Sequence, residues 1–98
     1  MAYLNAQERE RLKNELQGMN YNRAKSRLNR IDPSGRLVYW RNSQRVGEWH
    51  TRFDLPSLGT SVSLVEIIHA KPTDKDRVSR RQYEMVDVRV EPMPENQL

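Results

Sequence analysis

The sequence predicts an α+β protein in which an N-terminal two-helix hairpin packs on one face of a four-stranded antiparallel β-meander. Apolar residues recur with the period of a helix up to residue 31 and mostly with the period of a strand from residue 36 onward. Clusters of Gly, Pro, Asp and Ser separate these segments. A chain of 98 residues has room for one small core, which excludes two-domain enzymes and α/β barrels.

The first helix is expected over about residues 6–17. Asn5 can cap its N-terminus, and Glu8 three residues later completes the pattern of a capping box. Leucines follow with helical spacing. Gly18 is placed to end the helix in the left-handed conformation that Gly adopts readily.

The second helix is expected over about residues 21–31. Its apolar residues share one face and are Tyr21, Ala24, Leu28 and Ile31. The turn sequence of residues 32–35, which contains Pro33 and Gly35, ends this helix. Because the connection between the two helices is short, we expect them to form an αα-hairpin.

Four strands are expected, at about residues 36–43, 46–55, 60–70 and 82–91. In the second, Trp49, Thr51, Phe53 and Leu55 alternate with charged residues, which is typical of a strand with one buried face. A hairpin turning near residues 44–45 would place Trp40 opposite Trp49, Val38 opposite Thr51 and Arg41 opposite Glu48. Leu37 would then point away from the core with Tyr39.

The third and fourth strands are less regular. Glu66 interrupts the apolar residues of the third, which indicates a central strand or a bulge. In the fourth, the apolar residues change parity, which predicts a bulge near Met85. We expect residues 1–91 to form a single domain and residues 92–98 to form an extended Pro-containing tail.

Composition limits the chemistry. The chain has 17 Lys and Arg against 13 Asp and Glu, a net charge of +4 and a pI near 9.8. It has no cysteine, which excludes disulfides and thiolate chemistry, and its two histidines do not have the spacing of a metal site. No signal peptide or membrane span is expected, so we expect a cytoplasmic protein without cofactor, metal or membrane partner.

The basic residues concentrate in the second helix, which contains no acid. They are Arg23, Lys25, Arg27 and Arg30. The three arginines lie at positions i, i+4 and i+7, so they share one face, where like charges repel. A phosphate-bearing partner would relieve this repulsion. An ordinary solvated helix face explains the pattern equally well.

A second candidate surface is the outer face of the first hairpin, formed by Tyr39, Arg41, His50 and Arg52. Aromatic and basic side chains on an open sheet face occur in proteins that bind single-stranded nucleic acid and in protein interfaces. The polar loop of residues 71–81 adds Arg77, Arg80 and Arg81 as a possible basic finger or a plain exposed loop.

These features favour a small basic, non-enzymatic module that binds RNA, single-stranded DNA or a ribonucleoprotein. One alternative is an accessory subunit of a protein complex that binds through its sheet face and C-terminal tail. Another is a metal-free ribonuclease with Tyr39, Arg41, Glu48, His50 and Arg52 around a phosphate. If the basic helix and the outer sheet face lie on opposite sides, one continuous basic footprint is impossible, which favours the subunit.

Overall fold

The computed structural model describes residues 3–42, 48–69 and 82–94, with the backbone alone described for residues 39–42, 68–69 and 82–83. The elements in chain order are α1 (Ala6–Gln17), α2 (Tyr21–Ile31), β1 (Arg36–Asn42), β2 (Glu48–Leu55), the 3-10 turn η1 (Pro56–Leu58), β3 (Thr60–His69) and β4 (Gln82–Pro92). The four strands form one antiparallel sheet in the order β1-β2-β3-β4. The predicted fold class is therefore confirmed.

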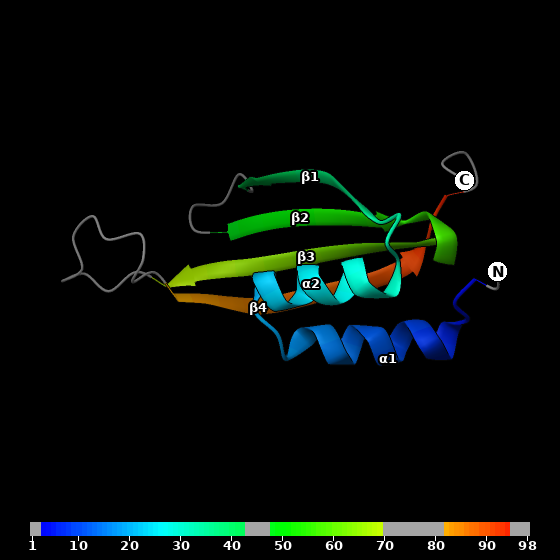
Figure 1. Ribbon diagram of the computed structural model, residues 1–98. Coiled ribbons are helices and arrows are strands. Elements are labelled where there is room, and N and C mark those ends of the chain that lie inside the picture. The colour runs from blue at the N-terminus through cyan, green and yellow to red at the C-terminus, as the bar shows by residue number, and fades with distance from the viewer. Residues whose placement is uncertain (1–2, 43–47, 70–81, 95–98) are drawn as a thin grey trace.

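Both helices lie on the same face of the sheet, and α1 packs against β4 (Figure 1). We call this the inner face, and the opposite one the outer face. The core fills the space between the two layers. Its buried members are Leu12, Leu16, Ala24, Leu28, Phe53, Leu55, Val62, Leu64 and Val88. Burying each leucine or phenylalanine stabilises the fold by about 1.5–3 kcal/mol, so this small cluster provides most of the driving force.

Side-chain caps fix where the helices begin. In α1 the Glu8 amide donates to Asn5 Oδ1 at 2.8 Å, and the Asn5 amide donates to Glu8 Oε1 at 3.0 Å, which confirms the capping box. Asn20 caps α2 by accepting a hydrogen bond from the Arg23 amide at 2.9 Å. Gly18 does end α1, but with φ of −87°. The expected left-handed conformation was therefore wrong at this position.

The predicted pairing of β1 with β2 is wrong by two residues at its aromatic end. Trp40 lies opposite Thr51, and Asn42 rather than Trp40 lies opposite Trp49. At the other end of the hairpin Arg36 lies opposite Asp54, which is one position from the predicted register, and the register shift between Leu37 and Tyr39 adds the second position. The pairing of aromatic residues did not reveal this irregularity of β1.

A register shift between Leu37 and Tyr39 also changes which way β1 faces. Leu37 pairs with the buried Phe53 and so lies on the inner face, against the expectation. It is nevertheless 44% exposed, because β1 is the edge strand that lies away from the two helices (Figure 1). An apolar position is thus left uncovered at the β1 edge.

In β4 the predicted bulge is confirmed. Val65 pairs with Asp87 and the next residue, Glu66, pairs with Met85, so Val86 is the extra residue. The predicted tail, however, begins too early. Pro92 still pairs with Thr60, which an edge strand permits because the missing N–H faces away from the sheet.

The chain remains attached to the domain just after β4. Met93 is only 4% exposed, and its amide donates to the carbonyl oxygen of Gly59 at 2.9 Å. The extended tail predicted from residue 92 therefore begins with residues that belong to the domain, since Pro92 is still in β4 and the apolar Met93 side chain is buried. The last four residues of the predicted tail, 95–98, lie outside the described part of the chain.

Candidate functional site

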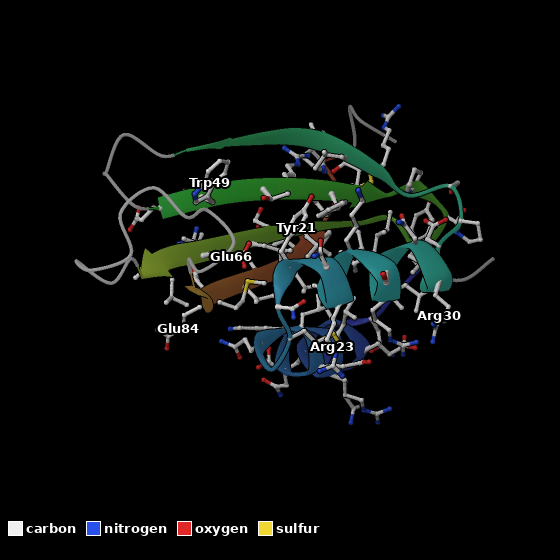
Figure 2. All side chains as sticks on the ribbon, turned by 60° about the vertical axis from the view of Figure 1, so that its left-hand side comes forward. Tyr21, Arg23, Arg30, Trp49, Glu66 and Glu84 are labelled. Carbon is white, nitrogen blue, oxygen red and sulfur yellow. The ribbon has the colours of Figure 1, made fainter. Side chains whose placement is uncertain are left out.

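The α2 basic surface consists of Arg23, Lys25, Arg27 and Arg30. Burial of Ala24 and Leu28 fixes the rotation of α2, so that Arg23, Lys25 and Arg30 are exposed. Figure 2 shows Arg23 and Arg30 near the two ends of the helix, outside the sheet. Among the described residues, none of these three exposed bases lies within salt-bridge distance of an acid.

Arg27 differs from the other three because it is paired. Its Nε donates to Glu15 Oε1 of α1 at 2.7 Å, and the two side chains are 37% and 39% exposed. An ion pair at this exposure contributes at most about 1 kcal/mol to stability. Glu15 therefore holds Arg27 against α1 weakly enough for a phosphate to compete for the guanidinium.

The outer sheet face is built differently. The register places Tyr39 opposite Arg52 and Arg41 opposite His50, so the predicted cluster is brought together at the level of the backbone. The side chains of Tyr39 and Arg41 lie outside the described part of the structure. The proximity of these four positions agrees with the prediction, although the pairs differ from those expected.

His50 and Arg52 both have acidic neighbours along β2. His50 Nε2 lies 3.4 Å from Glu48 Oε2. Arg52 Nε lies 3.2 Å from Oδ1 of Asp54, which is 3% exposed and also accepts a hydrogen bond from Ser61 Oγ at 3.1 Å. The charge of Arg52 is therefore partly neutralised within the strand, and His50 has a polar partner there.

The β4 side of the same face is mainly acidic. Glu84, Asp87 and Glu91 pair with β3 positions that alternate with the buried ones, so they lie on the outer face. Arg89 is the base among them, and its Nε lies 3.2 Å from Asp87 Oδ2. A face of mixed charge does not favour a polyanion.

The two predicted surfaces do not form one continuous footprint. The α2 basic surface belongs to the helix layer, whereas His50 and Arg52 belong to the face without helices (Figure 1). The predicted basic loop lies outside the described residues, and with it Arg77, Arg80 and Arg81. The structure thus leaves α2 as the strongest described candidate for contact with an anion.

A polar cluster joins the end of α2 to η1. Asp32 is 1% exposed and accepts hydrogen bonds from the Ser34 amide, the Ser34 hydroxyl and the Ser57 amide. Burial alone would raise the pKa of Asp32, but these hydrogen bonds outweigh it and hold the pKa below its usual value. Because the carboxylate is fully occupied, its role is to hold the turn.

Glu66 was not among the site residues predicted from the sequence. It lies on the inner face of β3, is 4% exposed, and is close to Tyr21 and Trp49 (Figure 2). Desolvation raises the pKa of Glu66, and a backbone hydrogen bond from Tyr21 opposes the rise. The only signal in the sequence was an acid in an otherwise apolar strand.

The chemistry available elsewhere is limited. The described residues contain no group of three His, Cys, Asp or Glu side chains that could hold a metal ion. Neither described helix is long and apolar enough to cross a membrane. Comparison with protein families, curated proteins and solved structures found no match to this chain.

Proposed function

We propose that this protein is a small non-enzymatic module that binds nucleic acid through the α2 basic surface, by contact with the sugar–phosphate backbone. The observation that carries the proposal is the exposure of Arg23, Lys25 and Arg30 on a helix without acids. Guanidinium groups that share one helix face, as those of Arg23 and Arg30 do, suit phosphates, and their mutual repulsion falls when an anion binds.

The geometry favours backbone contact over base recognition. The bases line the outside of a helix whose aromatic residue, Tyr21, is half-buried beside Phe53, with ring centroids 6.2 Å apart. The surface therefore offers charge but no stacking platform of the kind that reads single-stranded bases. We expect affinity to depend strongly on salt and weakly on sequence.

The test is fluorescence anisotropy with a labelled single-stranded RNA. Arg23→Gln combined with Arg30→Gln should weaken binding on the order of tenfold at 0.1 M salt, since two phosphate contacts are lost. The charge-matched control is Arg36→Gln combined with Arg89→Gln, which removes two exposed arginines of the sheet. Equal losses in both double variants would reject α2 as the contact surface.

The same samples separate binding from cleavage. Electrophoresis of the RNA after incubation should show intact substrate if the module is non-enzymatic. Cleavage that disappears when His50→Ala and Arg52→Ala are combined would instead support the ribonuclease alternative.

A second candidate is an accessory subunit of a protein complex. Two observations favour it: the basic helix and the outer face lie on opposite sides, and Leu37 and Val38 of the β1 edge are 44% and 45% exposed. Exposed apolar residues on an edge strand are typical of a contact with another chain. A stoichiometric partner that survives nuclease treatment and is lost on Leu37→Gln would support this candidate.

A further inference from the structure

The buried carboxylate of Glu66 occupies an unusual position. Along the inner face of β3 the preceding residues of the same parity, Thr60, Val62 and Leu64, are at most 1% exposed and belong to the packed interior. Glu66 continues this series toward the end of the sheet where α2 begins. Glu66 is therefore shielded from water, and none of the described residues forms an ion pair with it.

Only one of its two oxygens has a partner among the described residues. The backbone of Tyr21, the first residue of α2, hydrogen-bonds to the carboxylate. Oε2 is buried and accepts no hydrogen bond from any described group. Because buried carboxylate oxygens are nearly always hydrogen-bonded, an open acceptor of this kind requires an explanation.

Two aromatic side chains lie next to the Glu66 carboxylate. Trp49 is directly opposite Glu66 across the β2–β3 pair, and Tyr21 lies close enough for the Glu66 charge to raise the pKa of its hydroxyl further, after the larger effect of burial. Both side chains are half-buried, so each has part of its surface exposed to solvent while the Glu66 carboxylate between the sheet and α2 is buried. A negative charge beside aromatic rings attracts organic cations.

The alternatives fit less well. A metal ion needs several ligands, and no cluster of three suitable side chains is found in the described part of the chain. An anion is repelled by Glu66 itself. A proton would neutralise the charge but would create an O–H donor that needs an acceptor in turn.

We propose that Glu66, Tyr21 and Trp49 form a site for an organic cation, a guanidinium or ammonium group on a basic side chain or a small amine. Glu66 Oε2 accepts a hydrogen bond from the cation, and the rings of Tyr21 and Trp49 contact its flat or methylene surface. The site uses none of the residues of the α2 basic surface, and the proposal does not depend on nucleic-acid binding.

The test uses two matched probes, Nα-acetyl-arginine amide and its neutral isostere Nα-acetyl-citrulline amide. Amide and indole NMR signals of Tyr21, Glu66 and Trp49 should shift saturably with the arginine probe at pH 7. They should respond at least about tenfold more weakly to the citrulline probe, which lacks the charge. Equal responses to the two probes, or no saturable shift with either, would overturn the proposal without any need for a variant.

Two variants test whether Glu66 supplies the negative charge that binds the cation. Glu66→Gln keeps the side-chain size and should abolish the difference between the probes. The control, Glu84→Gln, removes an exposed acid of β4 on the opposite face and should leave that difference intact. An unchanged difference in Glu66→Gln, or its loss in Glu84→Gln, would contradict the assignment to Glu66.

The same NMR signals distinguish a small amine from a basic side chain of a protein as the bound cation. Shifts with free amines, such as the polyamine spermidine, at lower concentration than with the peptide-like arginine probe would indicate a small-molecule ligand. The reverse order would indicate a basic side chain of a protein partner. A shift with neither class of cation would overturn the proposal.

Discussion

The turn between α2 and β1 provides the sharpest stability prediction. Asp32 Oδ1 accepts hydrogen bonds from the Ser34 amide at 2.9 Å and the Ser34 hydroxyl at 2.6 Å. Its Oδ2 accepts one from the Ser57 amide at 3.0 Å. One carboxylate therefore joins the end of α2 to η1, which lies 25 residues later in the chain.

Asp32→Asn tests whether both oxygens are needed. If the amide oxygen faces Ser34, the new NH2 group faces the Ser57 N–H, and two donors meet in a buried position. If the amide flips, the same conflict arises at Ser34. Either arrangement leaves a buried donor unsatisfied, so we expect the free energy of unfolding to fall by about 2–3 kcal/mol. Asp32→Ala should cost more, because it removes the acceptor for all three donors.

The pH dependence of this cost has a definite sign. The pKa of Asp32 in the folded protein lies below its usual value of 3.8, so the ionised form stabilises the fold. That contribution is present above pH 3.8 and is lost as the pH falls through the lowered folded-state value. The difference in stability between wild type and Asp32→Asn should therefore shrink in acid.

Urea unfolding followed by circular dichroism, at pH 7 and in acid, measures both effects. The control is Asp87→Asn, which neutralises a side chain that is 43% exposed on the outer face and should change stability by less than about 0.5 kcal/mol. A loss in Asp32→Asn as small as in this control would refute the role assigned to the carboxylate. A difference that persists unchanged in acid would refute its ionised state.

Three further predictions concern other sites. Since the folded-state pKa of Glu66 is raised above 4.5, its ionisation should reduce stability as the pH rises from 4.5 through the folded value, and urea unfolding of Glu66→Gln should lack this loss. Gly59→Ala should lower the unfolding free energy by about 1–2 kcal/mol, because φ is +56° there and the new Cβ would lie 2.7 Å from the Tyr3 ring; a melting temperature equal to wild type would contradict this. Glu15→Gln should tighten RNA binding modestly in anisotropy, because it releases Arg27, while changing stability by no more than about 1 kcal/mol; weaker binding would show that the pair assists the contact.

The helices were predictable because their signals are local. The capping box at Asn5 and the stop at residues 32–35 lie within a few residues of the ends they determine, and both helices were found at the expected bounds. The bulge near Met85 was also visible, since it shifts the parity of neighbouring apolar residues. Alternation and capping depend on contacts close in sequence.

The β1–β2 register and the site were not predictable in the same way. The register includes a shift between Leu37 and Tyr39, and the turns beside it are joined by the hydrogen bond from the Ser57 amide to Asp32; no strand pattern contains either feature. The placement of Tyr39 and Arg41 beside Arg52 and His50 could be expected from alternation alone. The ion pair of Arg52 with Asp54, the contact of His50 with Glu48 and the approach of α2 to Glu66 could not be predicted from the sequence, because they depend on the exact positions of side chains.

The distribution of charged residues along the sequence predicted the basic helix but not the contacts of its side chains. The sequence shows four bases without an acid in α2, yet Glu15 of the other helix pairs with one of them. It cannot show that His50 and Arg52 lie on the outer face of the sheet, away from α2. The separation of these surfaces comes from the two-layer arrangement itself.

Amide chemical-shift mapping during titration with a single-stranded RNA tests the proposed role of α2 most directly. We expect the largest shifts at four residues of α2, Arg23, Lys25, Arg27 and Arg30, and we expect them to diminish as salt is added. The largest shifts at His50 and Arg52 of β2, with those of α2 unchanged, would contradict this role of α2.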